Sequence, residues 1–477
     1  MIRTIIRHEM LVNILNLRFV VGLLLSVILS VTCVLLLTHQ YRQELADYTT
    51  RVSLQNDFLD NYAHTNRIGG IITPQKPPEP IRPFIIGIQR DADLGSFDDN
   101  PLPVLFPSVD FVFIITIIMS LLAILFSYDS IAGERERGTL KLMNTCSISR
   151  AVILLGKWFG GLVVLLVPLA VSVIISALYV TLQPNIRWTG PDWLSFLSLV
   201  LASAAFVSLF YGVGLFTSSV ARHSSVSVLA SLSVWVLFIL VIPNLSPYVA
   251  AQFYRIPSVT KVEREVERLT SIERDNLGRE LSKKVYQDFE NRYGRAKIAF
   301  LTSNKREISA MLESNPELAP IYTSYREQIQ KAWNEANRIQ GEKAEKLSGD
   351  LGVRAKTQTK IAKNIASLSP YADYLYIATD LTGTGLRSLD HFSHVAGQYW
   401  GPFNSYKEKK VVEARKKDPT FDENSFLDVR DRPHFVFVEE PLKDRLTGVL
   451  PYWGILVLAN MVLFAGAFVS FLRYDVR

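Results

Sequence analysis

Six stretches of the chain are almost wholly apolar and long enough to cross a membrane. The hydrocarbon core of a bilayer is about 30 Å thick, and a helix needs about 20 apolar residues to span it. Leu, Val and Ile fill these stretches without the alternation of barrel strands, so helices, which satisfy their own backbone hydrogen bonds, are favoured. The pattern predicts an all-α polytopic membrane protein with spans at 19–37, 111–127, 160–182, 193–218, 226–243 and 449–472.

The composition agrees with a membrane protein. Hydrophobic residues make up 49% of the chain and charged residues only 20%, whereas an ordinary soluble domain has about 25% charged residues. The net charge of +6 suits loops that lie near anionic membrane lipid. The chain has no basic stripe with interleaved aromatic residues, so we expect no nucleic-acid partner.

The basic residues predict which way the spans run. Lys and Arg collect in short cytoplasmic loops; the link between spans two and three carries five of them, whereas the link between spans three and four carries only Arg187. We therefore expect both termini inside a bacterial cytoplasmic (inner) membrane, with the first span an uncleaved anchor. The expected layout is a cytoplasmic N-terminus with the first span (1–39), an extracytoplasmic loop (40–110), spans two to five (111–245), an extracytoplasmic domain (246–447), and the last span with a cytoplasmic tail (448–477).

The large predicted outer domain, 246–447, reads as mainly helical. Apolar residues recur every three or four positions over 262–293 and again over 321–366, with Pro316 and Pro320 between them. This spacing predicts a helical hairpin over 259–366 that is either a solvated strut or a binding surface. Further on, 380–385 resembles a turn before another helix and 434–438 resembles a short strand.

A charged segment near 129–150 follows directly after the second span. Its charged side chains would each cost about 3 kcal/mol at the bilayer centre, which excludes the segment from the membrane. Apolar residues such as Ile131 and Leu140 recur among the charges, as in a short amphipathic helix at the membrane surface. Because both charge signs are present, a docking surface for a protein partner explains the pattern better than attraction to lipid alone.

The run from Glu134 to Leu140, followed by 147–150 and the next span, resembles permeases of the type-2 ABC exporter family. In that family the corresponding stretch is a coupling helix that docks into a groove of the ATPase subunit. The resemblance covers the six spans and their cytoplasmic links, but simple family members lack the insert of about 200 residues before the last span. It implies that the coupling residues are Glu134, Arg135, Glu136, Arg137, Gly138, Thr139, Leu140 and Arg150.

The chain has no phosphate-binding loop of its own. Gly156 and Lys157 are followed by Trp158 rather than Ser or Thr, and a phosphate cradle also needs Gly-rich backbone at the start of a helix. We therefore expect no enzyme activity and no cofactor in this chain, with ATP and Mg²⁺ bound by a separate ATPase. His391 and His394 lack evident further ligands, and no Gly-x-Ser-x-Gly elbow is present, so we expect neither a metal site nor a hydrolase site.

Three functions fit these features. In the first, two copies of the chain, or this chain with a similar one, form the membrane core of an exporter with two ATPase subunits. Its substrate would be hydrophobic or amphipathic, because ionisable residues are almost absent from the spans and Lys157 is expected to snorkel at a span end. In the second, a mechanotransmission subunit drives an extracytoplasmic partner without cargo. The third, a scaffold without an ATPase, is disfavoured by the coupling-type segment.

Overall fold

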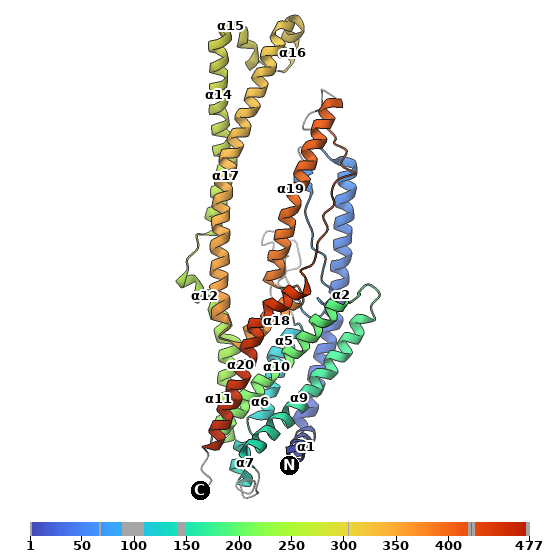
Figure 1. The fold of residues 1–477 in the computed structure, drawn as a ribbon, viewed down its shortest axis with the longest axis vertical. Helices are drawn as coiled ribbons and strands as arrows, with labels where there is room; N and C mark the ends of the chain where they lie inside the picture. Colours follow the sequence, from blue (N-terminus) through green and yellow to red (C-terminus); the bar gives the residue numbers. More distant parts are fainter. Residues whose placement is uncertain are drawn as a thin grey trace. The chain divides into compact units, whose positions relative to one another are not determined.

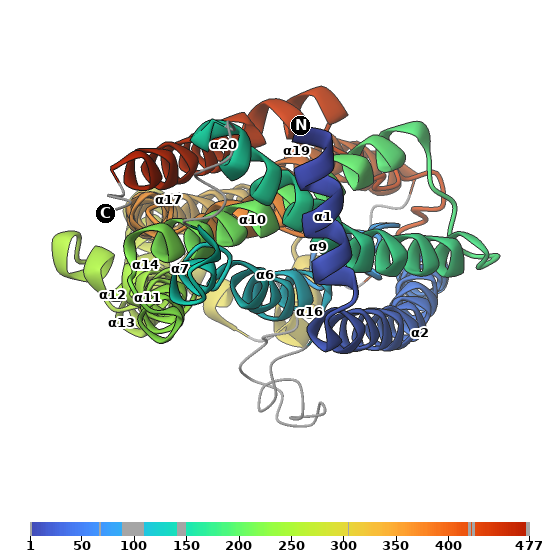
Figure 2. The same ribbon diagram turned by 90° about the horizontal axis from the view of Figure 1, so that it is seen from below.

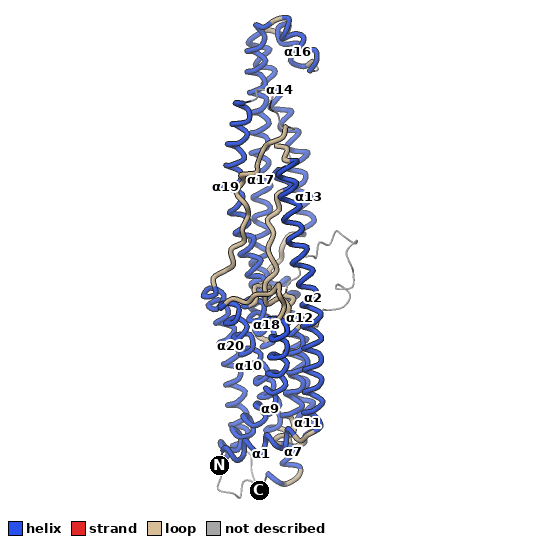
Figure 3. The backbone as a smooth tube through the Cα atoms, turned by 90° about the vertical axis from the view of Figure 1, so that its right-hand side faces the viewer, coloured by secondary structure: helices blue, strands red, loops and turns tan. Residues whose placement is uncertain are grey.

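The computed structural model describes residues 2–65, 68–87, 109–140, 149–303, 305–417, 421 and 425–473. Within these residues the chain is helical, and the β-type pairing consists of one isolated bridge between His64 and Phe426; Figure 3 accordingly shows helices joined by loops. The chain divides into two compact units, Met1–Asn244 with Ala366–Arg477, and Leu245–Ile365. We describe each unit by itself.

Six helices of the described residues are long and apolar enough to cross a membrane, which confirms the prediction. A separate helix, α1 (Ile2–Ile14), precedes the first of them (Figure 1), and two of the spans contain a π-helical segment. The spans are α2 (Leu17–Tyr62), the run Phe111–Glu136 made of α5 (Phe111–Phe113), η1 (Ile114–Met119), α6 (Ser120–Ser127) and α7 (Ala132–Glu136), α9 (Arg150–Thr181), α10 (Gly190–Val220), the run Ser224–Phe253 made of α11 (Ser224–Val236), η2 (Leu237–Val241) and α12 (Ile242–Phe253), and α20 (Leu442–Leu472).

Helix α10 is the centre of the first unit. It packs against α6, α9, α11 and α20. In its most apolar 18-residue stretch 67% is buried, whereas in the corresponding stretch of α20 only 17% is buried. Small residues on α10 let its neighbours approach closely: at Gly214 an added Cβ would collide with Ser127 of α6. The apolar face that α20 leaves exposed is suited to lipid or to another membrane chain.

A further helix, α18 (Pro370–Leu381), belongs to this same core. Ser369 donates a hydrogen bond to the carbonyl oxygen of Phe238, and Tyr374 stacks on Phe206 with ring centroids 4.9 Å apart. The compact units thus divide the predicted outer segment 246–447 at Ala366, and residues 366–447 belong to the same unit as the spans. Nine of the twelve residues of α18 are buried, so this helix is stabilised by burial in the core rather than by water.

Asp373 on α18 is fully buried. Burial raises the pKa of Asp373 to about 7. The native protein therefore keeps a proton that the unfolded chain releases near pH 4, and stability falls as pH rises from about 4 to about 7.

We expect the variant Asp373→Asn, which cannot ionise, to unfold at a higher temperature than the natural protein near pH 8, because it avoids a buried charge. Below about pH 4 the two proteins should unfold alike, since Asp373 is then neutral in both the folded and the unfolded state. Thermal unfolding in detergent at both pH values measures this. A variant that is less stable than the natural protein at pH 8 contradicts the assignment.

The turn at 380–385 and the helix after it are confirmed, whereas the strand at 434–438 is wrong. Helix α19 (Leu386–Lys417) begins directly after the turn. Residues 434–438 are extended but pair with no strand among the described residues. Their aromatic rings pack on α19 instead: Phe435 and Phe437 lie 6.1 and 5.8 Å from the ring of Phe392. The alternation that suggested a strand therefore reflects one face lying on a helix.

The second unit contains the predicted helical hairpin. Its first helical arm breaks at Gly294, whose φ of +82° suits glycine, rather than near Pro316. The arms approach closely where Gly278 faces Trp333, because an added Cβ at Gly278 would lie 2.5 Å from the indole ring. The helices are α13 (Val259–Arg268), η3 (Leu269–Glu273), α14 (Arg274–Tyr293), α15 (Arg295–Ile298), η4 (Ala299–Thr302), α16 (Lys305–Ser314), η5 (Pro316–Leu318) and α17 (Ala319–Ala366).

Candidate functional site

The charged segment begins with a short helix, α7, at the end of the run Phe111–Glu136, and the end of α10 caps this helix. The hydroxyl of Ser218 accepts hydrogen bonds from the backbone N–H groups of Ile131 and Ala132 at 3.0 and 2.9 Å. These N–H groups have no partner within α7, so the serine acts as a cap supplied by another helix. The start of α7 is thereby fixed to the end of the fourth span.

The chain leaves α7 through a glycine turn. Gly138 has a φ of +74°, a conformation that a side chain would oppose. The hydroxyl of Thr139 donates to the carbonyl oxygen of Glu134 at 3.2 Å, so Thr139 helps to close α7. Leu140 is fully buried, whereas Arg137 and Thr139 are exposed. Residues 141–148 lie outside the described part of the chain.

A buried ion cluster joins α7 to two other helices. The ammonium group of Lys157 on α9 lies 2.6 Å from a carboxylate oxygen of Glu134 and 2.6 Å from one of Glu9 on α1. The side chain of Lys157 is only 2% exposed, so the prediction that it snorkels to the surface is wrong. A buried charge is tolerated only with a partner of opposite charge. The apolar residues on both sides of Lys157 in the sequence could therefore have indicated that it is buried and paired with an acid.

The next two charged residues of the motif hold the link between spans four and five. Arg135 donates to the carbonyl oxygens of Ala221 and Ser219 at 2.6 and 3.1 Å, at the C-terminus of α10. Glu136 accepts hydrogen bonds from the backbone N–H and the hydroxyl of Ser224, both at 2.9 Å, at the N-terminus of α11. Each charge has the sign that the helix end favours. Both side chains therefore act as caps supplied by tertiary structure.

Arg150 lies apart from α7 and binds the last span. Its guanidinium group donates to the carbonyl oxygen of Leu472, at 2.7 Å, at the C-terminal end of α20. Ser149 caps the same end of α9, accepting a hydrogen bond from the backbone N–H of Val152 at 3.4 Å. The predicted site residues thus connect α7 with α9, α10 and α11, while Arg150 connects α9 with α20.

Helix α1, which the sequence analysis did not single out, lies across α9 (Figure 2). It fits there because two glycines of α9 leave room: an added Cβ would lie 2.5 Å from Ile5 at Gly156 and 2.8 Å from Glu9 at Gly160. Two small residues four positions apart form one flat strip on a helix. Gly160 thus permits the close approach of the two helices, and the contact places Glu9 beside Lys157.

A second ion pair joins the first span to the end of the second. Arg18 at the start of α2 lies 3.3 Å from Asp129 and donates to the hydroxyl of Tyr128 at 3.2 Å. Asp129 precedes α7 by three residues. The inner end of α2 is thus fixed directly beside the segment that carries the motif.

Comparisons with known proteins agree with this arrangement. A family model described as ABC-2 family transporter protein matches residues 3–476. Two proteins named "Probable ABC transporter permease protein NosY" are similar over part of the chain, at 32% identity over 126 residues for Stutzerimonas stutzeri and 33% over 136 residues for Pseudomonas aeruginosa. Each match covers 26% of this chain and 46% of the relative, so the chain spans about half the length of these relatives. The chain therefore belongs to the ABC-2 family of transporter proteins.

Proposed function

We propose that the chain couples a separate ATPase to the export of a hydrophobic or amphipathic substrate across a bacterial cytoplasmic membrane. Both termini and the segment Glu134–Leu140 would lie inside. Two copies, or this chain with a similar one, would assemble with two ATPase subunits, which bind ATP and Mg²⁺. One observation carries the proposal: the segment presents exposed groups at Arg137 and Thr139 on a base held to four helices.

The contacts of α7 support a mechanical role. Glu134 holds α1 and α9 through Lys157, Arg135 holds α10, and Glu136 holds α11. A docked ATPase that displaces α7 would therefore move the ends of several spans together rather than bend one loop. Coupling of this kind requires elements with defined alternative arrangements, and packed helices joined by buried ion pairs move as units.

The span interiors support an apolar or amphipathic cargo. Polar groups buried deep in the spans are mainly hydroxyls that bond to their own helix, as when Thr38 donates to the carbonyl of Val34 at 2.6 Å and Ser203 to that of Leu199 at 2.9 Å. Intramembrane acids or bases, which usually mark routes for ions and protons, lie in the described spans near the ends, as at Arg18, Asp192 and the cluster around Lys157.

A second candidate function is mechanotransmission to an extracytoplasmic partner. Helix α2 continues without a break from Leu17 to Tyr62, so it extends about 37 Å beyond its apolar part at 1.5 Å per residue. Reconstitution with the ATPase distinguishes the two functions: an exporter moves an amphipathic probe across vesicles when ATP is added. A mechanotransmission complex hydrolyses ATP through its ATPase without moving the probe, and it requires the extracytoplasmic partner for activity.

The coupling role is tested by reversing one exposed charge. Arg137 makes no ion pair with the described residues, so Arg137→Glu should fold normally. We expect at least a tenfold loss of ATPase co-purification, because like-charge contacts at an interface cost several kcal/mol. Changing Glu134 or Glu136 would be less informative, since both hold the fold. The matched control is Arg187→Glu, an exposed arginine of the link between spans three and four. Full ATPase binding and activity by Arg137→Glu would overturn the coupling assignment.

The proposed orientation is tested by cysteine labelling. In a chain whose Cys33 and Cys146 are replaced by Ser, a cysteine at the exposed position 53 on α2 should react with an impermeant thiol reagent in intact cells. A cysteine at position 139 should react only after the membrane is permeabilised, because the positive-inside rule places it in the cytoplasm. Reaction at position 139 in intact cells would show that the orientation is the reverse of the proposed one.

A further inference from the structure

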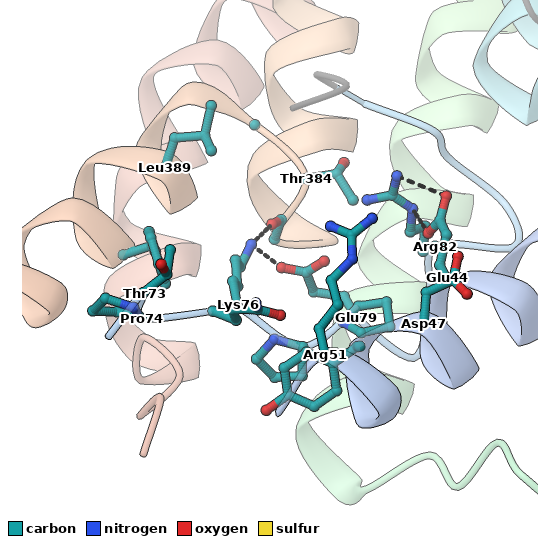
Figure 4. Close-up of a pocket in the computed structure, with 17 residues that line it drawn as sticks. Glu44, Asp47, Arg51, Thr73, Pro74, Lys76, Glu79, Arg82, Thr384 and Leu389 are labelled. Atoms are coloured by element: carbon teal, nitrogen blue, oxygen red, sulfur yellow. Dashed lines mark hydrogen bonds and ion pairs between the residues drawn. The ribbon is translucent and has the colours of Figure 1, made fainter. Parts of the chain in front are cut away.

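A pocket of about 620 Å³ opens in the first unit, among segments far apart in the sequence. Its walls are the continuation of α2 (Glu44 to Arg51), the Pro-rich segment 73–79, and the turn 383–385 that leads into α19 (Figure 4). All of these follow or precede spans on the side predicted to be extracytoplasmic. The volume falls in the range of about 300–1,000 Å³ that is usual for small-molecule sites.

Two ion pairs make the wall of this pocket rigid. Lys76 pairs with Glu79 and also donates to the carbonyl oxygen of Gly383 at 2.8 Å and to the hydroxyl of Ser388 at 2.6 Å. Arg82 pairs with Glu44 at 2.6 Å. The side chains of Lys76 and Glu79 are only 11% and 10% exposed. These four charges are therefore neutralised within the protein and hold the extended segment against both helices.

One acidic and one basic side chain of the pocket are not used in contacts within the described part of the chain. Asp47 and Arg51 are exposed, and neither makes an ion pair or a side-chain hydrogen bond with the described residues. They lie four positions apart on α2, hence on one face of the helix and about 6 Å apart at their Cβ atoms. Figure 4 shows Arg51 reaching into the pocket. The same pocket is lined by the rings of Tyr48 and Phe392.

We propose that this pocket binds a zwitterionic ligand of the amino-acid class, with its carboxylate on Arg51 and its ammonium on Asp47. The planar guanidinium fork matches a carboxylate with two parallel hydrogen bonds. The ammonium group of an α-amino acid is one carbon atom away from its carboxylate, so it falls within reach of an acid one helical turn away. The aromatic rings and the prolines of the wall receive an apolar ligand side chain.

The test pairs each ligand group with the residue that receives it. The probes are L-phenylalanine, its amide and its N-acetyl derivative, titrated by calorimetry into the full chain in nanodiscs. We expect amidation to weaken binding to the natural protein at least tenfold but to have little effect on Arg51→Ala, which has already lost the carboxylate contact. N-acetylation should weaken binding to the natural protein and have little effect on Asp47→Asn.

Both variants change exposed, uncommitted side chains, so they should fold normally. Arg279→Ala is the control, because it removes the same charge from an exposed position that does not line the pocket. The proposal is overturned if L-phenylalanine does not bind at concentrations up to about 10 mM. It is equally overturned if amidation weakens binding to Arg51→Ala as strongly as binding to the natural protein. The result does not depend on the proposed export function, because no ATPase is present in the experiment.

Discussion

Replacing Lys157 by Met is expected to destabilise the folded protein by about 3–5 kcal/mol, the usual cost of removing one partner of a buried ion pair. The change leaves Glu9 and Glu134 close together without the ammonium group that lies 2.6 Å from each. Two negative charges then remain in a largely buried site, and neither carboxylate is exposed enough for water to replace the lost ammonium group. Thermal unfolding in detergent measures the loss, with the exposed Lys360→Met as the matched control.

Neutralising the whole cluster should recover most of this stability. A variant with Lys157→Met, Glu9→Gln and Glu134→Gln carries no buried charge, and such replacements of buried ion pairs are often neutral or stabilising. The proposed coupling role adds a separate expectation: the triple variant should bind the ATPase but export less, because α7 is no longer fixed to α1 and α9. If Lys157→Met alone unfolds at the same temperature as the natural protein, the ion cluster does not stabilise the fold.

Gly161→Val is expected to have the second large effect, a destabilisation of about 1–3 kcal/mol typical of an overpacked core. An added Cβ at Gly161 would collide with the hydroxyl of Tyr211, which itself donates to the carbonyl oxygen of Lys157 at 3.0 Å. The new methyl groups must therefore push α10 away from α9 or break that hydrogen bond. Thermal unfolding again provides the measurement.

A double-mutant cycle assigns this effect to one contact. Combining Gly161→Val with Tyr211→Leu should cost less than the sum of the two single changes, because the smaller side chain makes room. Gly454→Ala on α20 is the control, since an added Cβ there meets nothing within 4 Å and alanine favours a helix over glycine. Additive costs in the cycle would show that the collision with Tyr211 is not the cause.

The elements of the fold were predictable because their signals are local. Each span is one continuous apolar run, and the hairpin of the second unit follows the spacing of three and four between apolar residues. The spacing of apolar residues identifies a helix wherever the segment is long. The same reasoning failed at 434–438, because alternating aromatic residues suit a strand and an extended segment lying on a helix equally well.

The position of the candidate site was also predictable, but the role of each residue in it was not. A charged run that ends a span and is followed by Gly138 marks a cytoplasmic turn by composition alone. Arg135 nevertheless meets a carbonyl oxygen 86 positions further along the chain, and Lys157 meets a carboxylate 148 positions before it. No spacing rule links residues so distant, because their meeting depends on how whole helices pack.

The sequence by itself therefore determined that this protein has six helices able to cross a membrane, a helical hairpin in its large insert and a charged segment after its second apolar run. Only the tertiary structure decided that Glu134, Arg135 and Glu136 act as ion-pair and capping groups, that α18 joins the core of the spans, and that Asp47 and Arg51 line one pocket. The physical reason is that apolar burial and helix period act over neighbouring residues, whereas ion pairs, caps and pockets arise only where distant helix surfaces are brought into contact.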